Sequence, residues 1–77
     1  LRMEEIKIPE KSSLTGVTLA KAQIPQRTGL IVLAVKRGRD EEWFFNPASS
    51  SLLQTGDRLI VLGESEKIDK LNLLIQT

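Results

Sequence analysis

The sequence predicts an α+β domain with a mixed or antiparallel four-stranded sheet and short helices, in the order β-α-β-β-β-α. Two apolar runs indicate this sheet, Leu30–Val35 after Gly29 and Leu59–Leu62 after a Gly-Asp turn. Both runs are short and rich in branched residues, as buried strands are. Because neither run alternates with polar residues, both faces of each strand are expected to be covered. We therefore predict that Leu59–Leu62 forms a central strand and that Leu30–Val35 pairs with it or lies next to it.

Alternating residues predict another strand at the start of the chain. Over residues 3–8, Ile6 and Ile8 share one face while charged side chains occupy the other, and Pro9 ends the pattern. A strand with one apolar face is expected to be half-buried and to lie towards an edge of the sheet.

A very short helix is predicted between the first two strands. Thr18 is a candidate cap for a helix of about one turn over Leu19–Ala22, because its hydroxyl can accept a hydrogen bond from the free amides of the first turn. A helix of this length depends on tertiary packing for its stability. Ile24-Pro25 is expected to end it, and residues 26–29 lead into the second strand.

The segment from residue 36 to residue 47 predicts a hairpin with a solvated tip, since a charged connection separates the second strand from three consecutive aromatic residues. On a strand, Trp43 and Phe45 point to one face and Phe44 to the other, so one face is expected to meet the core. The other face would present large apolar side chains. Either a helix covers each face of the sheet, or a second copy of the chain covers the remaining one.

The last predicted element is an amphipathic helix that starts at Ser65. Ser65 is a suitable cap, and Glu66 places an anion in the first turn, where the helix dipole favours it. Leu73 lies off the apolar face and is either simply exposed or a contact to a partner or to the rest of a parent chain. The apolar face consists of Ile68, Leu71, Leu74 and Ile75.

The composition argues against several functions. The 77 residues include no histidine and no cysteine, so a hydrolase triad, a thiolate nucleophile and a zinc site are not expected, and we predict that the chain is not an enzyme. The net charge of +1 gives no basic footprint for nucleic acid. No apolar run approaches the ~20 residues that cross a bilayer. The chain begins at Leu1 without a signal peptide, and residues 1–77 are expected to be a single domain from a longer protein.

Four motifs resemble, in order, the TrkA C-terminal domain, which is the C-lobe (RCK C) of the domain that regulates potassium conductance. The resemblance covers nearly the whole chain. It rests on the order and spacing of the motifs, because no single one of them is unique. The motifs are Ser13–Leu19, Thr28–Gly38, Asn46-Pro47 and Leu53–Gly63.

The resemblance implies a mixed sheet with flanking short helices, assembled as a homodimer. It also implies a non-catalytic regulatory domain in the cytoplasm, which follows a Rossmann-type N-lobe. Such a domain acts on a potassium channel, a potassium uptake system or a cation antiporter at the inner face of the membrane. In several members a small ligand, such as cyclic di-AMP or a divalent cation, binds in the C-lobe or at its dimer interface and biases the gate. The alternative is a structural dimerisation lobe of a carrier for something other than potassium, without a ligand of its own.

The resemblance places candidate ligand-binding residues at the predicted hairpin. Arg37 ends one strand and Asn46-Pro47 ends the next, where the family has an arginine and an Asn-Pro facing a dimer cleft. A phosphate-bearing nucleotide would use Arg37 as a charged fork and Asn46 as a hydrogen-bonding partner of a base edge, with Pro47 or a nearby isoleucine as an apolar wall. Arg27 is a candidate second cation.

Structural interpretations compete with these assignments. The acidic residues 40–42 would neutralise Arg37 and Arg39 as solvated charges of the hairpin, and their position beside the arginines weakens the case for cyclic di-AMP. The same carboxylates resemble a cation site, but consecutive residues on a short connection rarely converge on one ion, so a solvated tip is expected. Asp57 follows Gly56 and is expected to accept backbone hydrogen bonds within its turn.

Overall fold

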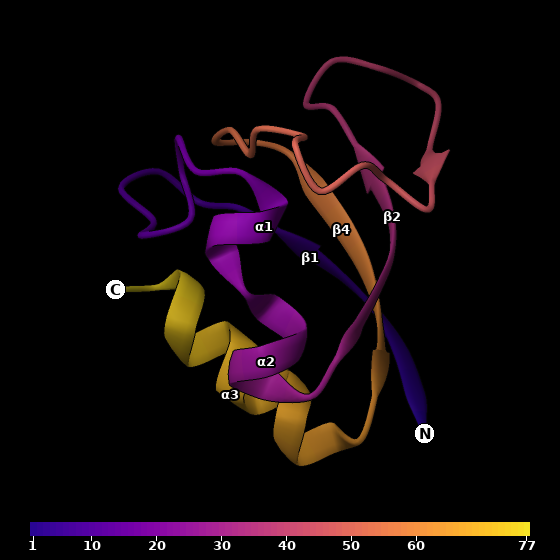
Figure 1. The fold of residues 1–77 in the computed structure, drawn as a ribbon, viewed down its shortest axis with the longest axis vertical. Helices are drawn as coiled ribbons and strands as arrows, with labels where there is room; N and C mark the ends of the chain where they lie inside the picture. The colour runs from indigo at the N-terminus through magenta and orange to yellow at the C-terminus, as the bar shows by residue number, and fades with distance from the viewer.

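The computed structural model describes residues 1–77 and places all helices on one side of a four-stranded sheet (Figure 1). This architecture confirms the predicted α+β class. None of the helices has the length and apolar character that spanning a membrane requires. In chain order the elements are β1 (Arg2–Lys7), α1 (Leu19–Ala22), α2 (Ile24–Thr28), β2 (Ile31–Lys36), β3 (Phe44–Phe45), β4 (Arg58–Gly63) and α3 (Ser65–Ile75).

The sheet is antiparallel throughout, with the strand order β1-β4-β2-β3. β4 is therefore central and β2 is its hydrogen-bonded neighbour, which confirms the two strands predicted from the apolar runs. β1 lies at one edge, as its alternating pattern predicts. Of the two predicted arrangements, mixed or antiparallel, the structure has the antiparallel one.

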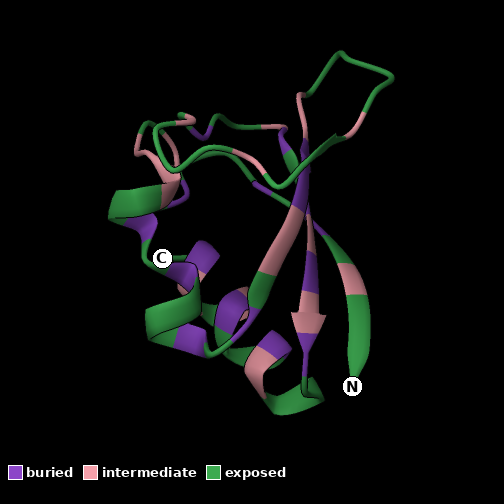
Figure 2. Cartoon of the chain, turned by 45° about the vertical axis from the view of Figure 1, so that its right-hand side comes forward, coloured by how far each residue is buried: buried purple, intermediate pink, exposed green.

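The helices cover only one face of the sheet (Figure 2). On that face Leu59 and Val61 of β4 are completely buried in the hydrophobic core, together with Leu71 of α3. The other face carries Ile60 and Leu62, which are only half-buried. The predicted alternative with a helix on each face of the sheet is therefore wrong. An unbroken apolar run shows that both faces of a strand are apolar, but it does not reveal what covers the second one.

The uncovered side of the sheet, which we call the open face, carries clustered apolar side chains. Ile31 of β2 is 56% exposed and Phe45 of β3 is 70% exposed. Ala34 is buried but lies outside the core cluster, and it pairs with Phe45 on one side and with Ile60 on the other. Paired residues of antiparallel strands share a face, so the register assigns these residues to one surface. The apolar side chains of the open face are those of Met3, Ile31, Ala34, Phe45, Ile60 and Leu62, and Glu5 of β1, which pairs with Ile60, lies on the same face.

Two short helices lie between β1 and β2, where the sequence predicts one. The Thr18 side chain accepts a hydrogen bond from the Lys21 amide at 3.2 Å, which confirms it as the cap of α1. Gln23 then adopts a φ of 52° and turns the chain, and α2 begins at Ile24, where the sequence predicts that helical structure ends. Pro25 fits the first turn of α2, because an amide at that position would have no helical partner.

α3 packs its apolar side against the sheet. The predicted cap is wrong, because Glu64 and not Ser65 occupies the cap position, without a side-chain hydrogen bond. The Ser65 hydroxyl instead accepts a hydrogen bond from Arg2 of β1 at 3.2 Å. Leu73 is exposed, and the predicted apolar side is confirmed. The buried or half-buried residues of this side are Ile68, Leu71, Leu74 and Ile75.

The aromatic run does not contribute to the core, so the prediction that one of its faces meets the core is wrong. β3 consists only of Phe44 and Phe45, and both rings are more than half exposed. Trp43 precedes β3 and is half-buried, with Lys36 Nζ 5.8 Å from its ring centroid, a cation–π arrangement. The physical reason is the position of β3, a very short strand at the edge of the sheet with only β2 beside it. The predicted hairpin and its exposed tip are confirmed.

Gly63 ends β4 in close contact with Leu30. A β-carbon at position 63 would overlap Leu30 Cδ2, and Leu30 is completely buried, so its side chain has little room to move. We expect Gly63→Ala to lower the free energy of unfolding by about 2 kcal/mol, measured by urea denaturation. Gly38→Ala is the matched control, because a β-carbon there would meet no atom closer than 3.5 Å. Equal losses in the two variants would contradict this explanation.

Candidate ligand-binding site

The most voluminous cleft of the structure lies beside the hairpin and measures about 440 Å³. Three of the four predicted site residues, Arg37, Asn46 and Pro47, line it. The two phenylalanines of β3 also line it, and their position in the sequence next to Asn46-Pro47 is the signal that could have predicted this. The lining residues are Val35, Arg37, Asp40, Phe44, Phe45, Asn46, Pro47, Ala48 and Ser51.

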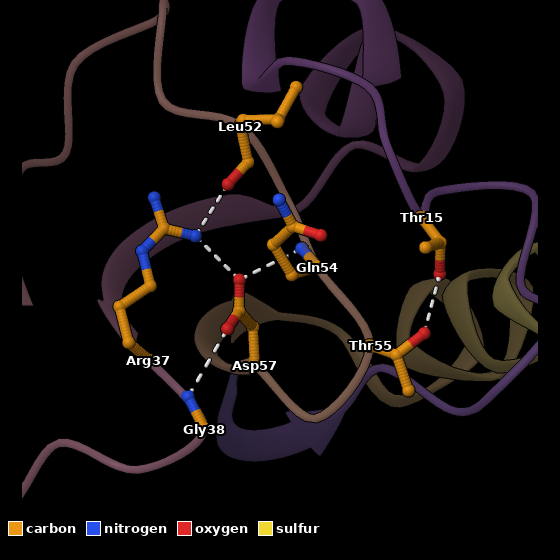
Figure 3. Close-up of polar contacts among 7 residues, drawn as sticks. All are labelled: Thr15, Arg37, Gly38, Leu52, Gln54, Thr55 and Asp57. Carbon is orange, nitrogen blue, oxygen red and sulfur yellow. Dashed lines mark hydrogen bonds and ion pairs between the residues drawn. The ribbon is translucent and has the colours of Figure 1, made fainter.

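Arg37 is fixed by an ion pair with Asp57 (Figure 3). Its Nη1 donates hydrogen bonds to the Asp57 carboxylate and to the carbonyl of Leu52. The same carboxylate accepts hydrogen bonds from the backbone amides of Gly38, at 3.2 Å, and Gln54, at 2.9 Å. The Asp57 side chain is 3% exposed, whereas that of Arg37 is 34% exposed. The prediction that Asp57 accepts backbone hydrogen bonds is confirmed, and its contact with Arg37 is an addition that the sequence did not reveal.

The turn that holds Asp57 is itself joined to β1. The Ile8 amide donates to the Asp57 carbonyl, and the Gly56 amide donates to the Ile8 carbonyl, both at 2.8 Å. The hydroxyls of Thr15 and Thr55 also lie 3.2 Å apart and hold two neighbouring turns together (Figure 3). Arg37 is therefore positioned by hydrogen bonds that connect β1, the end of β2 and the start of β4.

The ion pair sets the electrostatics of the cleft. Because Asp57 neutralises Arg37, the interpretation that residues 40–42 neutralise Arg37 is wrong. Those acidic residues form no ion pair within the chain, and Asp40 lines the cleft. Nε and Nη2 of Arg37 have no hydrogen-bonding partner in the protein and point away from Asp57 (Figure 3). This edge of the guanidinium retains its capacity to donate hydrogen bonds.

Asn46 is held in an unusual backbone conformation. It has a φ of 51°, in the left-handed region that asparagine tolerates better than most other residues. Its amide donates to the Leu33 carbonyl at 2.9 Å and thereby extends the pairing of the hairpin beyond β3. The backbone alone is thus one physical reason for an asparagine at this position. Asn46 also lines the cleft, next to Pro47.

A second hollow of about 320 Å³ adjoins the cleft and shares Pro47 with it. Its walls come mainly from α1, α2 and β2, and most of them are apolar. Ile31 belongs both to this hollow and to the open face. Ile31 and Pro47 both line this hollow, whereas Asn46 lines only the cleft. The lining residues are Leu19, Ala20, Ile24, Pro25, Gln26, Ile31, Val32, Pro47 and Ser49.

Arg27 lies elsewhere. It is in the last turn of α2 and lines a groove that this helix forms with α3. Within one chain the structure does not bring Arg27 together with Arg37, Asn46 and Pro47. Arg27 lies just before the second motif and was a candidate only as a further cation, and α2, which the sequence does not predict, carries it into this groove.

The acidic residues 40–42 do not converge on a common point that suits a metal ion. No group of three or more histidine, cysteine, aspartate or glutamate side chains in the chain is placed to hold a cation. All three carboxylates are exposed at the hairpin tip. Within one chain, the structure therefore provides no site for the divalent cation that the resemblance suggests.

The fold and the cleft define a small α+β domain in which a cleft of about 440 Å³ lies beside an uncovered apolar face of the sheet. The chain belongs to the TrkA-C domain family, because the family model matches residues 3–76. This match confirms the family that the four sequence motifs indicated.

Solved structures share this fold. The RCK C domain dimer of S. agalactiae BusR in complex with c-di-AMP (cyclic di-AMP) has a TM-score of 0.85 at 18% identity, over 99% of this chain and 91% of that chain. The RCK C domain of the potassium transport protein KtrA, in complex with c-di-AMP, has a TM-score of 0.81 at 27% identity, over 92% of this chain and 79% of that chain. The GsuK channel has a TM-score of 0.83 at 22% identity over 99% of this chain.

The chain corresponds to only part of the longer proteins among these relatives. It spans 14% of the GsuK channel and 36% of BusR in the complex with its busAB promoter DNA. At 22% and 18% identity these two structures show the fold alone. The similarity therefore assigns to this chain none of the functions of the other domains of those proteins.

Proposed function

We propose that the chain is a non-catalytic regulatory domain that pairs with a second copy of itself, binds c-di-AMP and thereby biases ion flow through a potassium channel or transporter. The observation that carries this proposal is the likeness to the KtrA RCK C domain, which was solved with c-di-AMP, at 27% identity. The cleft supports it, because Arg37, Asn46 and Pro47 supply a cation, an amide and an apolar wall at one place.

The cleft and the adjoining hollow suggest how such a ligand lies. Nε and Nη2 of Arg37 would donate hydrogen bonds to a phosphate. The Asn46 amide would exchange hydrogen bonds with the edge of a base. The base itself would pack against Pro47 and Ile31, in the hollow that shares Pro47 with the cleft.

The open face supports pairing with a second copy. It places exposed Ile31 and Phe45 beside half-buried Ile60 and Leu62, and nothing in the chain covers them. Contiguous exposed apolar side chains of this kind mark interaction surfaces. The BusR RCK C domain was solved as a dimer. Because Ile31 belongs to both the open face and the hollow, pairing and ligand binding would share a side chain.

Regulation requires that the ligand bind one arrangement of the pair more tightly than another. The domain would act on the cytoplasmic side of the membrane, as part of a longer protein with a Rossmann-type N-lobe. The sequence upstream of residue 1 tests this, since a pore helix, a multi-span carrier and a separate cytosolic subunit differ clearly. We expect no binding of nucleic acid by this chain itself, because its net charge is +1.

A purely structural dimerisation lobe is the second candidate. It is favoured by one observation, the neutralisation of Arg37 by buried Asp57 together with the position of Asp40 in the cleft. Both features reduce the attraction of the cleft for a phosphate. This candidate shares the open face with the first and differs from it only in the absence of a ligand.

Calorimetric titration of the 77-residue chain with c-di-AMP separates the two candidates. We expect saturable binding of c-di-AMP and no binding of magnesium ions alone. Asn46→Gly is expected to bind c-di-AMP about tenfold more weakly, because a base edge then loses a hydrogen-bonding partner. Glycine is chosen because it keeps the left-handed backbone of Asn46 available. Ser50→Gly, at an exposed position outside the cleft, is the matched control.

Three results of these measurements would each count against at least part of the proposal. No heat or stabilisation with c-di-AMP, in a chain that still forms pairs, would support the structural lobe and exclude the ligand-binding proposal. Binding that Asn46→Gly leaves unchanged would move the ligand away from this cleft. A chain that stays monomeric at high micromolar concentration, with and without c-di-AMP, would contradict both candidates.

A further inference from the structure

A basic groove between α2 and α3 has no role in the proposed function. It measures about 380 Å³, and we call it the α2–α3 groove. Leu73 on its rim is 68% exposed. Arg27 and Lys70 form no ion pair within the chain. The groove therefore presents two unpaired cations beside an exposed leucine. Its lining residues are Arg27, Thr28, Lys70, Leu73, Leu74 and Thr77.

The hairpin tip, residues 38–44, carries the opposite charge to the α2–α3 groove. Asp40, Glu41 and Glu42 are exposed and form no ion pair within the chain. Together with Phe44, whose ring is about half exposed, they surround a shallow hollow of about 290 Å³. The tip therefore presents carboxylates beside an aromatic ring. Even with Arg39 counted, the charged side chains of the tip carry a net negative charge.

The hairpin tip extends beyond the upper end of the sheet, well away from α2 and the C-terminal part of α3, which line the groove (Figures 1 and 2). The tip and the groove therefore do not meet within one chain. We infer that the hairpin tip of one copy docks in the α2–α3 groove of another copy. Carboxylates of the tip pair with Arg27 and Lys70, and Phe44 packs against Leu73. The acidic residues of α3 do not oppose this contact from within the groove, since Glu66 and Asp69 do not line it.

We place this contact in a head-to-tail arrangement, which is heterologous and leaves one free tip and one free groove after each addition. It therefore builds a ring or an open chain of copies. Pairing through the open face joins the same surface of both copies and stops at two. The inference does not depend on the proposed function, and the two contacts differ in chemistry. The head-to-tail contact is largely electrostatic and weakens with salt, whereas the open face is apolar.

Sedimentation velocity of the 77-residue chain tests the contact at about 0.05 M and about 0.5 M salt. We expect species larger than a pair at the lower salt and fewer of them at the higher. Lys70→Glu and Glu41→Lys are each expected to weaken this larger association about tenfold. The double variant Lys70→Glu/Glu41→Lys restores opposite charges and is expected to recover most of the loss.

Lys21→Glu and Glu10→Lys are the matched controls, because they make the same charge changes at exposed residues outside the groove and the tip. Circular dichroism establishes that each variant is folded. Recovery in the double variant supports the contact between copies. The inference is overturned if the wild-type chain never exceeds a pair, as expected if the groove binds an acidic segment of another protein. It is also overturned if Lys70→Glu behaves like Lys21→Glu, or if the double variant shows no recovery.

Discussion

Replacing Asp57 with alanine is expected to lower the free energy of unfolding by about 3 kcal/mol. The substitution removes a buried carboxylate that accepts hydrogen bonds from Arg37 and from the amides of Gly38 and Gln54. Those three partly buried hydrogen bonds are lost together, and the donors are left without their partner. Urea denaturation followed by Trp43 fluorescence measures the loss. Protein concentration is held constant, because pairing makes stability depend on it.

Arg37→Met provides the comparison for Asp57→Ala. It removes the other half of the ion pair but leaves the carboxylate bonded to the amides of Gly38 and Gln54. Arg37 is also one-third exposed, so its contribution is weakened by solvent. We expect a loss of about 1 kcal/mol. A loss as large as that of Asp57→Ala would show that the ion pair, and not the buried hydrogen bonds, stabilises this region.

The strands could be predicted from the sequence because local patterns determine them. The run Leu59–Leu62 and its neighbour Leu30–Val35 are short, branched and bounded by glycine, and both are strands of the sheet. α2 could not be predicted in the same way. It has only five residues with a proline near its start, and a left-handed Gln23 separates it from α1. Its stability comes from tertiary packing, which local periodicity does not report.

The candidate site could be predicted only in part. Arg37 and Asn46 were found through the family motif, and they do line one cleft. The partner of Arg37 was missed because Asp57 lies 20 residues further along the chain, and no periodic pattern links the two positions. Arg27 was considered for the same site only as a second cation, and its placement depends on α2, a helix that the sequence does not predict.

Leu59 and Ile60 are adjacent in β4 but lie on opposite faces of the sheet. Replacing each one with alanine is therefore expected to have a different effect on stability. Leu59 is completely buried under the helices, so Leu59→Ala leaves a cavity and is expected to lower the free energy of unfolding by about 3 kcal/mol. Ile60 is half-buried on the open face, and Ile60→Ala is expected to lower it by about 1 kcal/mol in a dilute, unpaired chain. Urea denaturation of each variant measures both effects.

Repeating the denaturation at low and high protein concentration tests whether the open face is a pairing surface. A pair stabilises the folded state by mass action, so the wild-type midpoint is expected to rise with concentration. Leu59→Ala should keep this rise, because its cavity lies on the helix side of the sheet. Ile60→Ala should reduce it, because it removes apolar area from the surface where two copies meet. If the midpoints of both variants rose equally with concentration, the copies would not pair through the open face. The apolar side chains of that face would then have another role.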